Sequence, residues 1–376
     1  MKVLTVVSKL EMGGIEKTLL SCIPYLHKNE VHVDILCSTG GELDAKFQKF
    51  GVKLIDFGNY KSQLCDFIKL FTVLKNNKYD VVHSRYGHTS GLFALVCWFL
   101  KVPLFVSIHN EKAMFLEKFE NTPIFKYPRK GYLSLHKFLT VKFATKIIGH
   151  SKANLRYYTK GTIASSKLYD LVYNGVDFSR LNDYTKISDT VLSDFISDAS
   201  KVILHIGKFK RQKNHSFLID VFHKLNPIKN NYKLILLGKG LLMKDCIAQV
   251  KSLGISDCVF FAGMVTDIRP YLAVSDVFFF PSLYEGFGNV LIEAQHTKIA
   301  ICASDIAPHY EAVFEKYYTY FFNPTDTNNA VLKLTDCIAS LEKTSHNDTL
   351  IKGYEFSNEF SVSHMATKLS KLFKSL

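Results

Sequence analysis

Short apolar runs alternate with longer helical patterns along almost the whole chain, and this alternation constrains the fold more than any other feature of the sequence. The runs are continuous and rich in β-branched residues, which is typical of parallel strands buried on both faces. The sequence therefore predicts an α/β protein with doubly wound parallel sheets. In the first half the predicted strands are Val3–Val7, Val31–Cys37, Val52–Phe57, Val81–His83, Leu104–Ile108 and Lys146–Ile148, with a helix at Glu16–Leu26.

The strand-and-helix pattern restarts after an interruption near mid-chain. An Asn-Gly turn within Tyr173–Asp177 and a polar stretch over 179–200 carry no strand signal. A second domain of the same class is expected, since one domain typically takes ~150 residues. We predict domains over 1–175 and 176–355 and a closing helix within 356–376. The strands predicted for the second domain are Val202–Ile206, Lys233–Leu237, Val259–Phe261, Val277–Phe280 and Ile299–Cys302, with a helix at Ser216–Leu225.

Two doubly wound domains joined near mid-chain are expected to place the carboxyl ends of both sheets across a cleft, where ligands bind. The loop Gly13–Lys17 opens a helix after the first strand and offers amides to a phosphate, although a tight turn would also use these glycines. Because Glu16 replaces the second glycine of a P-loop, that motif is excluded. The loop Gly207–Asn214 could clamp a diphosphate leaving group or be a solvated basic loop. Its cations are Lys208, Lys210, Arg211 and Lys213.

The most informative stretch follows the predicted strand Val277–Phe280. A glycine-rich loop contains Glu285, a helix is expected to begin near Asn289, and Glu293 lies about one turn into that helix. Two carboxylates can accept hydrogen bonds from a sugar ring and a ribose, while loop amides and the helix N-terminus face a phosphate. Each Glu alone could be a surface residue, but the glycines and the pair together indicate a binding site.

The stretch EGFGNVLIE, with Glu285 and Glu293 at E-x7-E spacing, resembles the signature of the family-4 retaining glycosyltransferases, which have the GT-B fold of two facing Rossmann-like domains. The tail is similar to the crossover helix that packs back on the first domain in that family. Other segments agree with the family in order: GGIEK (Gly13–Lys17), SIHN (Ser107–Asn110), HSKANLRYY (His150–Tyr158), YNGVD (Tyr173–Asp177), GKFKRQKN (Gly207–Asn214) and FAGMVTDI (Phe261–Ile268).

The resemblance implies a set of residues that bind the donor diphosphate. Gly14 would offer its amide near the phosphate, with Gly13 beside it. Lys208 and Lys213 match the Arg/Lys pair of the family. Lys208 replaces the arginine that is usual in the family. A lysine cannot make the bidentate contact that an arginine makes with a phosphate, and Arg211 is expected to compensate.

The resemblance also implies roles around the reacting sugar. Glu285 would contact the transferred sugar near its reacting centre, His109 would lie beside it, and Glu293 would hold the ribose. The family needs neither a metal nor another cofactor, and this sequence has no D-x-D after a strand. The loop amides expected near the phosphate are those of Phe287 and Gly288, with Gly286 and Asn289 as auxiliary residues.

These features predict a retaining glycosyltransferase that moves a sugar from a nucleotide diphosphate, UDP above all, to a hydroxyl of a lipid-linked or growing saccharide. By family similarity the setting is capsule, exopolysaccharide or lipopolysaccharide assembly. Two other enzymes of the same fold stay open, a sugar-nucleotide epimerase and a sugar phosphorylase. A non-catalytic binder of a polyanion would explain the charge but leave the paired glutamates without a purpose.

The net charge is +13, from 47 Lys and Arg against 34 Asp and Glu. Residues 121–160 contain no Asp or Glu, and aromatic residues lie among their cations. This segment predicts docking on an anionic membrane, and nucleic acid becomes the least favoured partner. The alternative is a solvated helix whose aromatic residues face the domain core. The apolar side expected for that helix consists of Leu135, Phe138, Leu139 and Phe143.

The location predicted for the protein is the cytoplasm, at the inner face of the cytoplasmic membrane. The chain starts in a strand pattern without a signal-peptide pattern, and its longest apolar run, Leu92–Leu100, is far shorter than the ~20 residues that span a bilayer. The eight cysteines are scattered without a C-x-x-C pair, so reduced and mostly buried thiols are expected.

Overall fold

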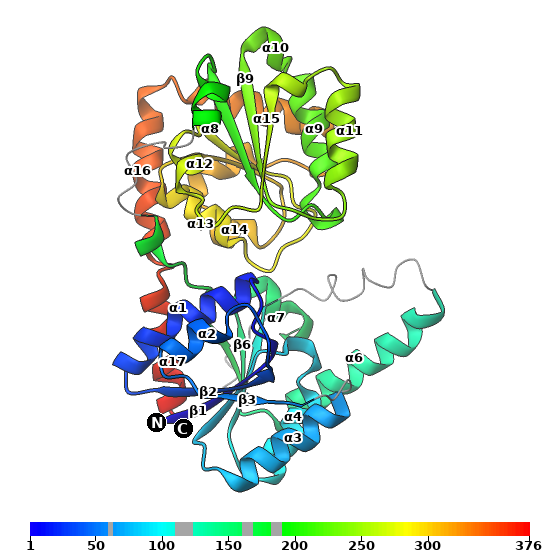
Figure 1. The fold of residues 1–376 in the computed structure, drawn as a ribbon, viewed down its shortest axis with the longest axis vertical. Coiled ribbons are helices and arrows are strands. Elements are labelled where there is room, and N and C mark those ends of the chain that lie inside the picture. Colours follow the sequence, from blue (N-terminus) through cyan, green and yellow to red (C-terminus); the bar gives the residue numbers. More distant parts are fainter. Residues whose placement is uncertain (59–62, 110–122, 160–167, 182–189) are drawn as a thin grey trace. The chain divides into compact units, whose positions relative to one another are not determined.

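The computed structural model describes residues 1–58, 63–109, 123–159, 168–181 and 190–376, which form two compact units (Figure 1). The first unit comprises Met1–Asp177 and Phe360–Leu376, and the second comprises Phe178–Glu359. Sequence analysis predicted the boundaries between these units at 175/176 and 355/356. The structure places them at 177/178 and 359/360. Seven cysteines are free and buried, and the side chain of Cys65 lies outside the described residues.

The first unit is built on a parallel sheet of seven strands in the order β3-β2-β1-β4-β5-β6-β7. The order reverses between β1 and β4, since β1 leads to β2 on one side and β4 leads to β5 on the other. This switch point is where a doubly wound sheet binds ligands. The strands are β1 (Lys2–Lys9), β2 (His32–Ser38), β3 (Leu54–Asp56), β4 (Val81–Ser84), β5 (Leu104–Ile108), β6 (Lys146–Gly149) and β7 (Tyr169–Leu171).

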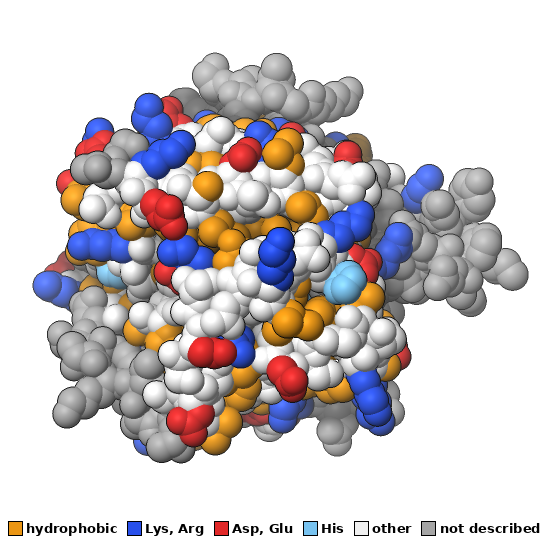
Figure 2. All heavy atoms as spheres, turned by 90° about the horizontal axis from the view of Figure 1, so that it is seen from above, with side chains coloured by type: hydrophobic (Ala, Val, Ile, Leu, Met, Phe, Trp, Pro, Cys, Tyr) orange, Lys and Arg blue, Asp and Glu red, His pale blue; other side chains and the backbone are white. Residues whose placement is uncertain are grey.

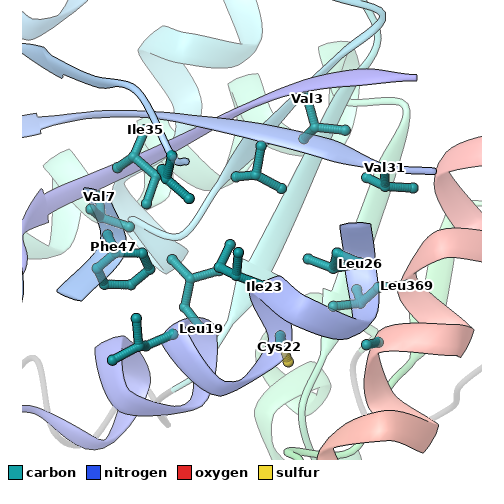
Figure 3. Packing of buried hydrophobic residues seen from close by; sticks show 14 of the residues in the cluster. Val3, Val7, Leu19, Cys22, Ile23, Leu26, Val31, Ile35, Phe47 and Leu369 are labelled. Carbon is teal, nitrogen blue, oxygen red and sulfur yellow. The ribbon is translucent and has the colours of Figure 1, made fainter. Parts of the chain in front are cut away.

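Helices cover this sheet. Helix α1 (Gly14–Lys28) lays Leu19, Ile23 and Leu26 on the sheet, because these residues recur at helical spacing on one face (Figure 3). Each such side chain contributes about 1.5–3 kcal/mol when fully buried. The other helices are α2 (Asp44–Lys49), α3 (Gln63–Asn76), α4 (Gly91–Phe99), α6 (Pro123–Phe143) and α7 (Lys152–Thr159).

The predicted closing helix is present as α17 (Val362–Lys374) and packs on α1 of the first unit. Leu369 lies beside α1 in Figure 3 and belongs to the same buried cluster as Ile23. The first residue of this helix is bonded to the first unit, since the Val362 amide donates to the Val176 carbonyl at 2.9 Å. The tail therefore completes a core that begins at the other end of the sequence.

The second unit has a parallel sheet of five strands in the order β10-β9-β8-β11-β12, with its switch point between β8 and β11. The strands are β8 (Lys201–Ile206), β9 (Tyr232–Leu237), β10 (Val259–Gly263), β11 (Val277–Phe280) and β12 (Ala300–Ala303). The helices are α8 (Thr190–Ile196), α9 (His215–Lys224), α10 (Pro227–Asn230), α11 (Met243–Ser252), α12 (Arg269–Ala273), α13 (Asn289–His296), α14 (His309–Ala312), α15 (Thr327–Ser340) and α16 (Thr344–Asn358).

Every predicted strand is present, and the predicted bounds of β5 and β11 match the structure. The strand β7 was not predicted, because its three residues, Tyr-Asp-Leu, are too short and too polar to give a strand signal. Several helices were not predicted individually, and one of them is α16, whose polar composition leaves a weak helical pattern. Among the described residues no helix is long and apolar enough to cross a membrane.

Candidate active site

The second unit brings two of the predicted loops together at its switch point. The basic loop Gly207–Asn214 follows β8, and the loop Pro281–Gly288 follows β11. Because β8 and β11 are neighbouring parallel strands, both loops leave the same edge of the sheet. The cations of the loop Gly207–Asn214 and the Glu285 carboxylate of the loop Pro281–Gly288 therefore both lie at the edge of the sheet where a ligand is expected.

Lys213 and Glu285 form an ion pair across these two loops. Nζ of Lys213 lies 2.6 Å from Oε1 of Glu285, and the two side chains are 15% and 10% exposed. The ammonium also lies 4.3 Å from the centre of the Phe280 ring, a cation–π contact that holds it near the end of β11. Partial burial reduces screening by water, so this pair is a strong local dipole at the edge of the sheet.

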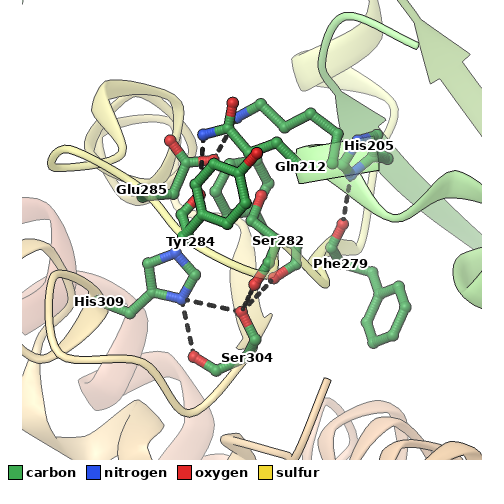
Figure 4. Close-up of polar contacts among 10 residues, drawn as sticks. His205, Gln212, Phe279, Ser282, Tyr284, Glu285, Ser304 and His309 are labelled. Atoms are coloured by element: carbon green, nitrogen blue, oxygen red, sulfur yellow. Dashed lines mark hydrogen bonds and ion pairs between the residues drawn. The ribbon is translucent and has the colours of Figure 1, made fainter. Parts of the chain in front are cut away.

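Two hydrogen bonds between Gln212 and the backbone of the loop after β11 fix the spacing of the same loops. Its side-chain amide donates to the Tyr284 carbonyl at 2.8 Å, and its carbonyl accepts from the Leu283 amide at 2.9 Å (Figure 4). Gln212 is buried. The ion pair thus stands on loops that are already bonded to each other, which preorganises it.

A third loop supports the basic loop from the side. Gly238, after β9, has a φ of +135°, and a Cβ there would collide with the Gly207 carbonyl. A Cβ at Gly240 would collide with the Phe209 carbonyl in the same way. The G-x-G in this position therefore serves close backbone packing.

A buried polar layer underlies Glu285, and sequence analysis missed it. His309 is fully buried and places Nδ1 2.7 Å from the Ser304 carbonyl, while the Ser304 hydroxyl donates to the Ser282 carbonyl at 2.6 Å (Figure 4). Burial lowers the pKa of His309 to about 4, although the nearby Glu285 charge opposes this. Sequence analysis could have found this layer from Ser304. That residue directly follows β12, the strand beside β11.

The glycine loop runs into α13 as predicted. Gly288 adopts a φ of +103° and is the N-cap of α13, which begins at Asn289. Gly286 and Asn289 are half-buried, whereas Phe287 is buried. Glu293 lies in the second turn of α13 and is half-buried.

The remaining cations of the basic loop differ from Lys213 in exposure. Lys208 and Arg211 are exposed, whereas Lys213 is half-buried and held by Glu285. Among the cations predicted to clamp a diphosphate, Lys213 contacts the loop Pro281–Gly288 through its ion pair with Glu285. In the described part of the chain, no group of three or more His, Cys, Asp or Glu is arranged to hold a metal ion.

The other predicted site residues belong to the first unit. Gly13 is the N-cap of α1 without a side-chain cap, and a Cβ added at Gly14 would meet nothing within 4 Å. His109 directly follows β5, is 6% exposed, and stacks on His150 with ring centres 4.1 Å apart. Burial lowers the pKa of His109 well below its usual value, so its imidazole is neutral at pH 7.

Sequence analysis also missed Arg85, which follows β4 and is 7% exposed. Its Nη2 donates to the Ile15 carbonyl at 3.5 Å, and so reaches from the end of β4 to the first turn of α1. Arg85 thus spans the switch point of the first sheet. The signal that could have found it is its place two residues after the strand pattern Val81–His83.

Comparison with known proteins agrees with this architecture. The sequence profile described as "Glycosyltransferase Family 4" matches residues 12–180, and the one described as "Glycosyl transferases group 1" matches residues 193–348. The solved structure of Anabaena Alr3699/HepE in complex with UDP superposes with a TM-score of 0.81 over 100% of both chains at 21% identity.

Two curated relatives match most of the chain. The N-acetylgalactosamine-N,N'-diacetylbacillosaminyl-diphospho-undecaprenol 4-alpha-N-acetylgalactosaminyltransferase of Campylobacter jejuni is 26% identical over 307 residues, which cover 79% of this chain and 78% of that protein. The capsular polysaccharide biosynthesis glycosyltransferase CapH of Staphylococcus aureus is 27% identical over 316 residues, which cover 82% and 83%.

Two Rossmann-like units, each with a loop site at its switch point, together with these matches, define a glycosyltransferase with the GT-B fold. Within that class the chain belongs to the family-4 glycosyltransferases, as its resemblance at the E-x7-E stretch implied.

Proposed function

We propose that this glycosyltransferase moves a sugar from a UDP-sugar to a hydroxyl of a lipid-linked or growing saccharide, with retention of configuration, in the assembly of a bacterial surface polysaccharide. The ion pair between Lys213 and Glu285 at the switch point of the second sheet carries the proposal. Support comes from the capsular and diphospho-undecaprenol names of the relatives and from the UDP in the HepE complex.

In the proposed reaction the bond between the anomeric carbon and the diphosphate oxygen breaks, and the diphosphate leaves with the electron pair. The acceptor hydroxyl attacks the same face of the sugar, and its proton passes to the departing phosphate. Lys213 stabilises the charge that develops on the leaving group, since a cation already held in place needs no reorganisation. Lys208 and Arg211, on the exposed side of the loop, contact the outer part of the diphosphate in this proposal.

Glu285 and His109 position the sugar rather than attack it. The Glu285 carboxylate is held by Lys213 and accepts hydrogen bonds from sugar hydroxyls. His109 is neutral at pH 7 and can both donate and accept a hydrogen bond. Glu293 holds the ribose, the amides near Gly286–Asn289 and Gly14 face the phosphates, and no metal is required.

The test measures UDP release and product configuration with purified protein. UDP-, GDP- and ADP-sugars are screened with a lipid-linked or saccharide acceptor, and the anomeric configuration of the product is read by NMR. We expect acceptor-dependent UDP release and an α-linked product from an α-linked donor. Conversion of the donor without acceptor would show an epimerase instead, and dependence on inorganic phosphate would show a phosphorylase.

We further propose that α6 and α4 dock the enzyme on the anionic inner face of the cytoplasmic membrane. Leu135, Phe138 and Val141 on α6 are 54%, 57% and 37% exposed, while the polar His136 and Thr140 are buried. A helix in water normally turns the other way, with apolar residues inward. The expectation that Leu135 and Phe138 face the core is therefore wrong, because α6 packs on α4 through the opposite side.

The apolar face continues onto α4, where Trp98 and Phe99 are 57% and 67% exposed. The Trp98 ring lies 4.9 Å from that of Phe143, and Lys142 lies over Phe138 and Phe143 at 5.5 and 5.3 Å. Neither helix contains Asp or Glu. This mixture of rings and lysine suits a lipid headgroup layer.

The face of the molecule drawn in Figure 2 does not share this pattern. On the face drawn in Figure 2, Lys and Arg side chains are interspersed with Asp and Glu and do not gather into one patch. The side chains of residues 123–129 and 157, and residues 121, 122 and 160, lie outside the described residues of the predicted segment 121–160. The proposed docking face therefore rests on the C-terminal half of α6 and on α4.

A further inference from the structure

His309 is a buried histidine behind the glycine loop, and the proposed reaction gives it no role. It is the first residue of α14 and is 0% exposed. Because it has no exposed surface with which to contact a substrate, any effect of this residue on sugar transfer must pass through its neighbours. Those neighbours lie at both ends of the loop Pro281–Gly288, which carries Glu285.

At the start of this loop the contact runs through Ser304. Nδ1 of His309 lies 2.7 Å from the Ser304 carbonyl oxygen, which can only accept, so Nδ1 carries the proton. The Ser304 hydroxyl in turn donates to the Ser282 carbonyl at 2.6 Å (Figure 4). The Nδ1 donor thus holds the residue that holds Ser282, three positions before Glu285.

At the end of the loop the His309 ring itself lies close to the backbone. A Cβ placed on Gly288 would lie 3.9 Å from Cδ2 of His309. The ring centre is also 5.4 Å from that of Phe280, the last residue of β11, and the Lys213 ammonium lies over the same Phe280 ring. One side chain therefore lies against both the strand before the loop and the glycine that ends it.

The opposite side of the loop is held from the end of β8. Gln212 donates to the Tyr284 carbonyl and accepts from the Leu283 amide. The residues directly before Glu285 are therefore bonded to the loop after β8 on one side and, through Ser304, to the loop after β12 on the other. Loss of either set of bonds leaves the Glu285 backbone with support from one side.

The charge state of His309 matters because the ion pair is near. Burial lowers the pKa of His309 to about 4, which the Glu285 charge opposes and the Lys213 charge reinforces. The imidazole is therefore neutral at pH 7 and does not compete with Lys213 for the Glu285 carboxylate. Its Nε2 has no hydrogen-bond partner among the described residues, so Nδ1 makes the hydrogen bonds of this ring.

We propose that His309 is a positioning residue for sugar transfer, which holds the Glu285 carboxylate in place by donating from Nδ1 to the Ser304 carbonyl. This inference rests on the proposed function, in which Glu285 contacts the transferred sugar. Misplacing a group that orients the substrate by ~1 Å can cost ~10²-fold in rate, even when the change is distant from the reacting atoms. A residue that only fills space would need its ring and not its donor.

Two variants separate the donor from the ring. His309→Phe keeps a ring of similar size without the Nδ1 donor, and His309→Asn keeps a donor near the position of Nδ1 without the full ring. We expect His309→Phe to lower kcat for sugar transfer about tenfold and His309→Asn to stay within about threefold of the wild type. In both, the affinity for UDP, which carries no sugar, should change less than about twofold, as should the KM for the donor.

His346→Phe is the matched control. His346 is also buried in the second unit, its Nδ1 lies 3.1 Å from the Ser340 hydroxyl, and its Nε2 likewise lacks a partner among the described residues. This variant should keep the wild-type kcat even where its Tm falls. Wild-type kcat in His309→Phe, or a lower kcat in His309→Asn than in His309→Phe, would overturn the inference.

Ser304→Ala tests the same contact with a smaller change, in case His309→Phe does not fold. It removes the hydroxyl that holds Ser282, so kcat should fall about threefold or more while the affinity for UDP stays unchanged, in line with one lost hydrogen bond. Ser340→Ala, at the serine paired with His346, is its control. An unchanged kcat in Ser304→Ala would mean that the bond to Ser282 does not position Glu285.

Hydrogen exchange in the full chain gives a readout that needs no substrate. The amides of residues 283–288 should exchange faster in His309→Phe and Ser304→Ala than in the wild type, and His346→Phe should leave them unchanged. Unaltered exchange in both loop variants would overturn the inference. Absence of sugar transfer by the wild type would count against the proposed function alone, because the exchange comparison still decides whether His309 holds the loop.

Discussion

At the scale of single residues, the ion pair of Lys213 and Glu285 joins positions that are 72 residues apart. Each partner restricts the other, so the ammonium has a defined position before the diphosphate of the proposed reaction binds. The same geometry means that removal of one partner leaves the other partly buried and uncompensated, which is why truncation affects more than one contact.

Lys213→Ala should therefore reduce kcat for sugar transfer about 10²–10³-fold, the range seen when one preorganised charge-stabilising group is removed. UDP release in the presence of acceptor measures this. Lys251→Ala, at an exposed lysine on α11 of the same unit, is the control and should keep wild-type activity. Full activity in Lys213→Ala would remove the ion pair from the proposed site.

Buried neutral histidines give the fold a defined dependence on pH. Burial lowers the pKa of His150 to about 3, below the usual value of 6.5, so the unfolded chain binds this proton at a higher pH than the folded chain does. The contribution of neutral His150 to the free energy of unfolding is therefore fully present above about pH 6.5. It is lost as the pH falls from there toward 3.

His150→Asn should remove the one proton that the unfolded chain takes up at this position and the folded chain does not. Between pH 6 and 4, the free energy of unfolding of this variant should fall less steeply than that of the wild type, by about 1.4 kcal/mol per pH unit. Urea unfolding at pH 6, 5 and 4 measures the two slopes. Identical slopes would show that His150 is protonated in the folded state or is neutral in both states.

At the scale of secondary-structure elements, α6 shows how packing can reverse the expected orientation of a helix. Its side toward α4 is fixed by a close approach, because a Cβ at Gly91 would lie 2.7 Å from backbone atoms of His136. The His136 ring then accepts a hydrogen bond from the Gly91 amide at 3.0 Å. Once this contact turns His136 inward, Leu135 and Phe138 must face outward.

The outward face should bind anionic vesicles. At low salt we expect the protein to sediment with vesicles of phosphatidylglycerol and phosphatidylcholine, and the double variant Leu135→Ser with Phe138→Ser to bind at least tenfold more weakly. Each of these side chains would otherwise bury apolar area worth about 1.5–3 kcal/mol. Leu332→Ser, at an equally exposed leucine of the second unit, is the control. Equal retention of the double variant would dismiss this face as the docking surface.

At the scale of the whole molecule, the first unit needs both ends of the chain. Leu369 and Phe373 of α17 complete the apolar cluster formed by α1 and the first strands. A segment of the second half of the sequence is thus part of the core of the first half, and the second unit is inserted between the two pieces.

Leu369→Ala should destabilise the first unit by about 2–5 kcal/mol, the usual result of truncating a buried leucine. Hydrogen exchange should accelerate for the amides of α1, β1 and β2 but not for those of β8 and β11. Lys371→Ala, at an exposed position of the same helix, should leave exchange unchanged. Acceleration confined to the second unit would contradict this division of the core.

The sequence by itself determined the elements and the order of the site loops. Continuous apolar runs such as Leu104–Ile108 and Val277–Phe280 mark strands buried on both faces whatever their neighbours are. The glycine loop with Glu285 and the helix with Glu293 follow one such run directly, so their place at its carboxyl end follows from chain order alone.

Only the tertiary structure decided which of these ends lie together. The pairing of Lys213 with Glu285 depends on β8 lying beside β11, and the stacking of His109 on His150 depends on β5 and β6 being neighbours. The outward face of α6 depends on its contact with α4. Hydrophobic periodicity reports which side chains leave water, but strand order and helix rotation are set by packing partners distant in the sequence, which local patterns do not encode.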